Sequence, residues 1–363
     1  MINFPDHLSY GTRIFFASFK QRFSLKKYPG TAKEICTQIV NDCWNGHFFQ
    51  TSTTNYSQFW TRDFGWCCKS LIKLGHKDKV HQTLRYALNR FQKYGKITTT
   101  ISIRGKPFDI PRASVDSLPY LIHSIKISSL PLSNYTNFLN KQIQSFFEEI
   151  IDPETGLVRS DKKFSSMKDM SIRKSSCYDN VLVALLAKDL KTMNLKNPFQ
   201  KYNYPQILYR NFWNGEFFYD DLTKLDYVAS DANVLPFAFS LIQNKEMLNS
   251  SLQAIQKNRL DQPFPLRYTT EKAKVKFIWE EIFAKNYELS SIWTHIGPFY
   301  IKLLQQTNPE LAKMHYQAYT QIIEKYGNYL EVFEVKKKEA KPFQSPFYFC
   351  DQGMLWAANY LTL

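Results

Sequence analysis

Apolar residues recur at helical spacing along most of this 363-residue chain, and this periodicity restricts it to folds that are built from helices. The apolar alternation that is typical of strands is rare. The spacing predicts helices over residues 32–43, 64–75, 78–94, 115–127, 135–150, 177–193, 232–243, 247–257, 290–306, 309–326 and 351–361.

The predicted helices come roughly in pairs, and the stretches between them are long and aromatic. Residues 197–221, for example, are rich in aromatic residues and contain Gly and Pro, which is unusual for a simple connector. This arrangement favours helical hairpins around an axis, an all-α toroid. Periodicity alone does not separate a toroid from a superhelical solenoid, although the chain lacks a repeat of roughly 34 or 40 residues.

No Pro-, Gly- or Ser-rich linker and no low-complexity tract marks a domain boundary. We therefore expect residues 1–363 to form one domain, with residues 1–30 as an N-terminal extension that packs on the barrel. No apolar run approaches the roughly 18 residues of a membrane span, and the N-terminus lacks the pattern of a signal peptide. The sequence thus predicts a soluble, cytoplasmic protein with no membrane partner.

A formal net charge of +15 would suit a nucleic-acid partner, but the basic residues are spread along the chain. They cluster only at residues 334–341, and no zinc-finger, KH or RNA-recognition motif is present. A solvated basic surface is therefore the preferred interpretation, and nucleic acid is not expected as a partner.

Cysteines stand in apolar surroundings, without the spacing of a disulfide framework or of a zinc site, and we interpret them as reduced core thiols. They are Cys36, Cys43, Cys67, Cys68, Cys177 and Cys350. The chain also lacks an H-E-x-x-H motif and clustered His and Cys residues, so no metal ligands and no cofactor are predicted.

Aromatic residues form 16% of the chain and concentrate near acidic residues at predicted helix starts. Sugar rings stack their C–H faces on aromatic side chains, while their hydroxyl groups need carboxylate or guanidinium partners. Glycoside hydrolysis also needs two carboxyl groups, one that protonates the leaving oxygen and one that activates water or attacks the sugar. Acidic residues in aromatic segments are therefore candidates for a carbohydrate site.

Two candidates lie in the first third of the chain. The segment "FWTRDFGW" (59–66) places Arg62 and Asp63 at a predicted helix start among Trp60 and other aromatic residues. Asp116 enters an apolar helix in "ASVDSLPYLI" (113–122). Either aspartate could instead be a helix N-cap.

The remaining candidates lie further along. Asp169 stands in an irregular polar stretch, and Asp179 lies early in the next apolar helix. Asp231 also precedes an apolar helix, and a capping role is the preferred interpretation for it. Glu331 in "NYLEVF" would be buried among apolar neighbours, which costs several kcal/mol unless the carboxylate is paired or used.

With these residues identified, the chain resembles the six-hairpin (α/α)6 glycosidases: glucoamylases, trehalases, alkaline/neutral invertases and the glucosidase domain of glycogen debranching enzymes. "FWTRDFGW" is similar to the W-x-R-D helix start of this group, which implies that Arg62 and Asp63 bind sugar hydroxyls beside Trp60. "ASVDSLPYLI" is similar to the V-D-S stretch of the invertases, which makes Asp116 a pocket residue or a cap.

The resemblance also implies the catalytic pair. "MKDMSIRK" (167–174) is similar to a motif whose aspartate is the general acid, and Asp169 takes that position. The closing segment, "LEVF" with a later Trp356, is similar to one whose glutamate is the general base or nucleophile, and Glu331 takes that position. The chain departs from these patterns at Met167, Lys168 and Met170 in the first motif, and at Glu334, where the group often has aspartate.

The resemblance therefore implies a glycoside hydrolase of the (α/α)6 toroid fold, acting on a carbohydrate without a metal or cofactor. Inversion predicts carboxyl groups roughly 6.5–9.5 Å apart. Asp179 remains a rival acid, although a helix start favours its ionised form. Trp293 and His295 are predicted to line the pocket. Two alternatives stay open: a sugar epimerase or lyase with paired histidines, and a non-catalytic basic binding protein.

Overall fold

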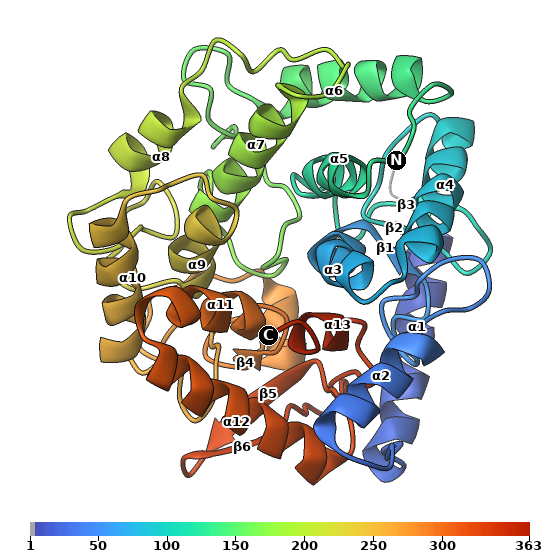
Figure 1. Cartoon of the computed structure of the whole chain (residues 1–363), viewed down its shortest axis with the longest axis vertical. Helices are drawn as coiled ribbons and strands as arrows, with labels where there is room; N and C mark the ends of the chain where they lie inside the picture. The colour runs from blue at the N-terminus through green and yellow to red at the C-terminus, as the bar shows by residue number, and fades with distance from the viewer. Residues whose placement is uncertain (1–3) are drawn as a thin grey trace.

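Two concentric rings of helices make up the computed structural model, which describes residues 4–363 and the side chains from residue 11 onward (Figure 1). The inner ring consists of α3 (Thr61–Lys73), α5 (Ser117–Ser128), α7 (Cys177–Leu190), α9 (Ser230–Ala238), α11 (Gly297–Thr307) and α13 (Ala357–Tyr360). The outer ring consists of α2 (Ala32–Asp42), α4 (Lys77–Tyr94), α6 (Thr136–Ile150), α8 (Tyr204–Phe212), α10 (Lys245–Lys257) and α12 (Pro309–Tyr326). Each outer helix leads into an inner one, which confirms the predicted (α/α)6 toroid.

The two rings differ in how much of each helix is buried. On the inner helix α7, every residue except Lys188 is buried, because α5 and α9 pack on its sides. The outer helix α4 buries a single stripe that includes Val80, Leu84 and Leu88, the pattern of a helix with one face in solvent. Buried apolar side chains of both rings form one continuous cluster.

The last hairpin closes the ring against the first. α13 packs on α3 and α2, and the Ser70 hydroxyl of α3 donates a 2.7 Å hydrogen bond to the Asn359 side chain of α13. The first and last hairpins therefore meet at one seam of the toroid.

Two small antiparallel sheets shape the loops at one end of the inner helices. The first has the order β1 (Phe59–Trp60), β2 (Thr100–Ile101) and β3 (Pro107–Phe108), and β1 leads directly into α3. The second has the order β4 (Ile292–Trp293), β5 (Val332–Lys336) and β6 (Glu339–Pro342). Its register pairs Ile292 with Phe333 and Trp293 with Val332, which fixes the segment before α11 beside the segment after α12.

Helix α1 (Phe4–Phe23) precedes the ring and lies against loops of its first and last hairpins. Arg13 donates a 2.6 Å hydrogen bond to Gln58, Gln21 donates one of 2.6 Å to Asn55, and Arg22 donates to the carbonyl oxygen of Ser345. Of the predicted extension over residues 1–30, residues 1–3 lie outside the described residues.

Some predicted element boundaries were wrong. The helix predicted over residues 290–306 starts only at Gly297, because strand pairing holds Ile292 and Trp293 extended. The last predicted helix, residues 351–361, is helical only at Ala357–Tyr360, because Asp351 and its neighbours form a loop that bonds to residues 51–56. Helices α1 and α8 were not predicted, and α8 lies inside the aromatic stretch that was interpreted as a loop.

All six cysteines are buried free thiols, as predicted. Along residues 4–363, none of the helices combines the length and the apolar content that crossing a bilayer requires.

We expect Gly65→Ala to lower the free energy of unfolding by roughly 1–3 kcal/mol. A Cβ at Gly65 would lie 2.6 Å from the Cβ of Tyr120 on α5, so overpacking outweighs the gain of about 1 kcal/mol in helix propensity. The control is Gly11→Ala on α1, where an added Cβ meets no atom within 4 Å. Urea denaturation measures both variants, and a Gly65→Ala protein as stable as wild type would contradict this packing.

Candidate active site

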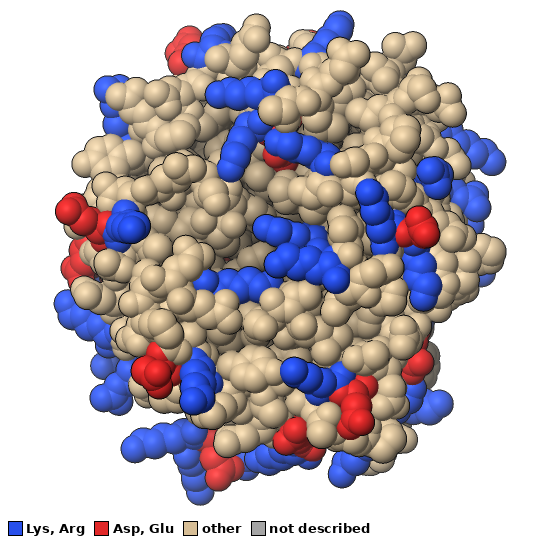
Figure 2. All heavy atoms as spheres, viewed as in Figure 1, with Lys and Arg blue, Asp and Glu red and all other residues tan. Residues whose placement is uncertain are grey.

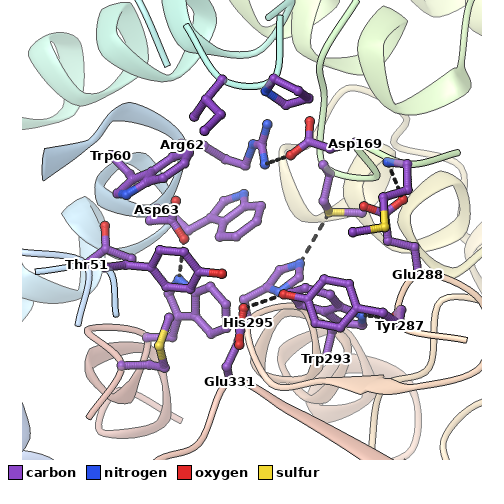
Figure 3. A pocket seen from close by; sticks show the side chains of 18 of the residues that line it. Thr51, Trp60, Arg62, Asp63, Asp169, Tyr287, Glu288, Trp293, His295 and Glu331 are labelled. Atoms are coloured by element: carbon purple, nitrogen blue, oxygen red, sulfur yellow. Dashed lines mark hydrogen bonds and ion pairs between the residues drawn. The ribbon is translucent and has the colours of Figure 1, made fainter. Parts of the chain in front are cut away.

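A cavity of about 310 Å³ lies at the N-terminal ends of the inner helices (Figure 3). The first turns of α3 form part of its wall, together with the segments that precede α7, α11 and α13. Of the residues predicted for the site, it is lined by Trp60, Arg62, Asp63, Asp169, Trp293, His295, Glu331 and Trp356. Asp116 and Asp179, which were also predicted for the site, do not line this cavity.

Asp63 lies in the first turn of α3, whose N-cap is Trp60. The interpretation of Asp63 as a cap is therefore wrong. Its Oδ1 accepts a 3.0 Å hydrogen bond from the indole N–H of Trp356, which joins the first hairpin to the last. Burial raises the pKa of Asp63 to about 7, against the opposing charge of Arg62.

Arg62 pairs with carboxylates that are distant in sequence rather than with its neighbour Asp63. Its Nε lies 2.5 Å from Oδ2 of Asp116, and its Nη1 lies 3.8 Å from Oδ2 of Asp169. The Asp116 side chain is fully buried and accepts a second hydrogen bond, of 3.0 Å, from the Tyr178 hydroxyl. Asp116 therefore holds Arg62 from behind. It occupies the N-cap position of α5, one of its two predicted places, but its side chain makes no capping hydrogen bond.

Asp169 lies on the irregular segment that leads to α7. Its Oδ1 accepts hydrogen bonds from the Ser165 hydroxyl and, at 3.1 Å, from the Ser166 backbone N–H, while its Oδ2 faces Arg62. The side chain is 28% exposed, which leaves Oδ2 open to the cavity. Burial raises the pKa of Asp169, and the charge of Arg62 opposes this increase.

Glu331 immediately precedes β5 and reaches the cavity from the other half of the chain. Tyr287 donates a 2.7 Å hydrogen bond to its Oε1, and its Oε2 accepts from the Tyr348 hydroxyl and, at 2.9 Å, from the Asp351 backbone N–H. Burial, with the charge of Asp351, raises the pKa of Glu331 to about 7. In Figure 3, Glu331 and Asp169 approach the cavity from different sides.

Two carboxyl groups that were not predicted for the site also line the cavity, that of Glu280 and, anchored by backbone N–H groups, that of Glu288. Its Oε2 accepts hydrogen bonds from the backbone N–H groups of Met170 (2.8 Å) and Ser171 (3.0 Å), so it anchors the segment that carries Asp169. Burial, with the charge of Asp169, raises the pKa of Glu288 to about 7. Glu288 follows Tyr287 shortly before Trp293, the same mixture of acid and aromatic residues that identified Glu331.

Aromatic rings form the floor of the cavity around His295. Trp66 stacks on the imidazole with ring centroids 4.0 Å apart and an interplanar angle of 1°, and Trp356 meets its edge at 4.9 Å. Burial, with the charge of Arg62, lowers the pKa of His295 well below its usual value, so the ring is neutral. Among the described residues that line the cavity, His295 is the only histidine.

A buried cluster of four charges lies behind Asp169. Lys168 Nζ lies 3.2 Å from Asp220 and 2.8 Å from Asp231, and Arg173 Nη1 lies 3.4 Å and 3.2 Å from the same two carboxylates. The cluster ties both ends of the segment around Asp169 to α9 and its preceding loop. Asp231 is therefore an ion-pair partner, and its interpretation as a helix cap is wrong because the N-cap of α9 is Ala229.

Asp179, the rival acid, lies in a small neighbouring hollow rather than in the cavity. Its Oδ2 accepts a 2.7 Å hydrogen bond from Ser176, the N-cap of α7, and burial raises the pKa of Asp179 to about 7. Within the described part of the chain, no group of three or more His, Cys, Asp or Glu side chains could hold a metal ion.

We expect Lys168→Met to lower the free energy of unfolding by roughly 3 kcal/mol, because it leaves two buried aspartates with one cation. The matched control is Lys257→Met, which breaks an exposed 3.4 Å pair with Glu216 and should cost less than about 1 kcal/mol. Chemical denaturation compares the two. Equal losses would contradict a buried, charge-balanced cluster.

We expect the stability of the protein to fall as the pH rises from about 4.5 to about 7. In this window the folded chain retains a proton on Glu331, whose pKa is raised from 4.5 to about 7, while the unfolded chain has released it. Glu331→Gln should remove up to about 3 kcal/mol of this decrease. Denaturation at several pH values measures the slope, and a variant that keeps the wild-type slope would refute the assignment. Glu246→Gln on the exposed face of α10 is the control.

The amino-acid sequence matches no protein-family profile and no curated protein sequence. Solved structures, in contrast, share its fold. A rhamnosidase from Klebsiella oxytoca with rhamnose bound superposes with a TM-score of 0.63 at 10% identity, over 93% of this chain and 65% of that one. The chain thus spans less than two thirds of the length of this relative.

Shorter proteins match over nearly their full length. A mannosylglycerate hydrolase from Thermus thermophilus in complex with glucose gives a TM-score of 0.64 at 11% identity, over 92% of this chain and 100% of that one. A glycosidase variant gives 0.65 at 10% identity, over 91% and 94% of the two chains. The resemblance to the six-hairpin glycosidases is therefore confirmed at the level of the fold.

Proposed function

We propose that this protein is a glycoside hydrolase that cleaves a small glycoside or an oligosaccharide end with inversion, with Asp169 as general acid and Glu331 as general base. One observation carries the proposal: two carboxyl groups from distant parts of the chain, the buried Glu331 and the partly exposed Asp169, line a single cavity together with tryptophans and Arg62. This combination fits a sugar ring and the two proton transfers that breaking its glycosidic bond requires.

In the proposed reaction, Asp169 gives its proton from Oδ2 to the leaving oxygen. Oδ1 is held by Ser165 and Ser166, so Oδ2 is the oxygen free to carry and deliver the proton. Burial raises the pKa of Asp169, the direction of shift that a proton donor requires. The nearby guanidinium of Arg62 then stabilises the carboxylate that remains after transfer.

Glu331 takes a proton from the attacking water. Hydrogen bonds from Tyr287 and Tyr348 orient its two oxygens, and a pKa of about 7 suits a group that exchanges protons near neutrality. Water adds to the anomeric carbon from the face opposite the leaving group, the glycosidic bond breaks, and the configuration inverts. This geometry requires the two carboxyl groups to be roughly 6.5–9.5 Å apart.

The remaining lining residues suit sugar binding. Trp60, Trp66 and Trp356 offer apolar surfaces for ring C–H groups, and Asp63 with Arg62 offers partners for hydroxyl groups. The cavity is at the small end of the roughly 300–1,000 Å³ typical of ligand pockets, which favours a small glycoside. The similar structures, with rhamnose or glucose bound, support a hexose or deoxyhexose at this position.

A sugar epimerase is less well supported, because it needs two histidines and His295 is the only one among the described lining residues. A basic binding protein is the second candidate. Figure 2 shows Lys and Arg spread over one face, with several near its centre over α3 and α11. Burial, with the charges of Lys73 and Lys69, lowers the pKa of Lys302 on α11 to about 8. Salt-sensitive binding of DNA without any effect of sugars on melting would favour this function.

We expect Asp169→Asn and Glu331→Gln each to lower kcat by roughly 10²–10⁴-fold on disaccharides. Asp169→Asn should lose much less on aryl glycosides with acidic phenol leaving groups, because these need no protonation, whereas Glu331→Gln should lose activity on both. The wild-type kcat/KM should also fall below about pH 7 as Glu331 gains a proton. Initial rates on both substrate types measure these effects.

The controls make the same substitutions outside the cavity. Glu334→Gln, on the strand that follows Glu331 and paired with Lys336 at 2.7 Å, and Asp161→Asn, in an exposed loop, should both keep wild-type kcat. Cleavage that survives Asp169→Asn and Glu331→Gln unchanged would remove the proposed function.

A further inference from the structure

A second, smaller hollow adjoins the cavity. Its volume is about 30 Å³, and it shares Ile278 with the cavity. The segment that carries Asp169 separates the two: Met167, Asp169 and Met170 line the cavity, whereas the residues between and after them line the hollow.

The hollow is strongly basic. Arg112, Arg159, Lys162 and Lys163 line it, together with Lys168 and Arg173 of the buried charge cluster. Asp220 and Asp231 neutralise Lys168 and Arg173, but none of the other four cations lies within ion-pair distance of a described carboxylate. Backbone hydrogen bonds, helped by the charge of Arg159, lower the pKa of Asp152, although the side chains of Arg159 and Asp152 do not form an ion pair. Among the described residues that line the hollow, Asp179 has the one carboxyl group.

One of these cations has an unused buried donor. The Nε of Arg159 is shielded from solvent and has no hydrogen-bond partner, while the backbone of Arg159 is fixed by a 2.8 Å bond to the carbonyl oxygen of Ile150. A buried donor without a partner is costly, so a guest that accepts a hydrogen bond from it would be stabilised. Guanidinium groups bind phosphate and carboxylate oxygens especially well.

Size limits what the guest can be. A single water needs roughly 10–15 Å³ of such space, so 30 Å³ holds two or three waters or one oxyanion, and it does not hold a sugar ring. The hollow therefore suits a charged substituent rather than an additional sugar unit.

We propose that this hollow binds an oxyanion of the phosphate or carboxylate class, carried by the glycoside whose sugar ring occupies the cavity. This inference rests on the proposed function, and it narrows the substrate to an anionic glycoside. The anionic group would sit across the Asp169 segment from the sugar and accept hydrogen bonds from Arg159, with Arg112 and Lys163 closing around it.

The test uses the full chain and matched pairs of glycosides that differ only in a terminal carboxylate or carboxamide, and sugars with or without a phosphate. The wild-type protein should prefer the anionic member by at least tenfold in kcat/KM. Arg112→Gln combined with Lys163→Gln, both exposed positions, should reduce that preference at least fivefold, and Arg159→Gln should do the same. Arg85→Gln combined with Lys313→Gln changes the net charge equally on exposed outer helices and should keep the wild-type preference.

A second experiment measures binding and does not depend on turnover. Titration of the Asp169→Asn protein with inorganic phosphate should give a Kd that the Arg112→Gln/Lys163→Gln pair weakens at least fivefold and the control pair leaves unchanged. Phosphate binding of this kind, with no preference for anionic glycosides, would support the oxyanion site and identify a free anion as its guest. The proposal would be overturned if the wild-type protein neither preferred anionic glycosides nor bound phosphate at this site, or if the control pair of substitutions weakened both as much. This holds even if neutral glycosides are cleaved.

Discussion

A single guanidinium group connects three neighbouring hairpins at the cavity. Arg62 extends from the first turn of α3, binds Asp116 before α5 and faces Asp169 before α7. Asp116 is fully buried, so without this partner its charge would be severely destabilising. The ion pair therefore adds to hydrogen bonds between these hairpins, such as the one from the Tyr178 hydroxyl to Asp116, and it lies at the end of the toroid where the carboxyl groups gather.

The cavity concentrates acidic groups in a place where water is scarce. Asp63, Glu288 and Glu331 each have a pKa raised to about 7, in every case mainly by burial. Their hydrogen-bond donors differ, and these differences separate their roles. Glu288 is engaged by the backbone of the Asp169 segment and Asp63 by an indole, whereas Glu331 is oriented by two tyrosine hydroxyls.

The helical architecture could be predicted from sequence because the outer helices carry strong apolar periodicity, while inner helices such as α7 and α9 are apolar over most of their length. The segments around Arg62 and Glu331 could also be identified, since an acid among aromatic residues is unusual in a core. Loop geometry could not be predicted in the same way. Whether Asp116 and Asp179 face the cavity depends on how the segments before α5 and α7 turn, and periodicity carries no information about that turn.

The other differences between the predicted and the observed structure also arise from contacts between residues that are distant in sequence. Residues 290–296 have a helical pattern, yet pairing with a strand that follows Glu331 in sequence holds part of them extended. Lys168 and Asp231 are far apart in sequence, so their buried ion pair has no local signature. Glu288 carries the same local signal as Glu331, a carboxyl group close to aromatic residues, so its place in the site is predictable from sequence.

The seam of the toroid has a consequence for how a ligand and the fold affect each other. Asp63 of the first hairpin and Trp356 of the last hold one another across the seam, and both also line the cavity. A molecule that binds both residues would hold the first and last hairpins together. Binding of such a molecule in the cavity should slow the opening of the ring. Hydrogen exchange in α13 and α2 should then also slow, although neither helix lines the cavity.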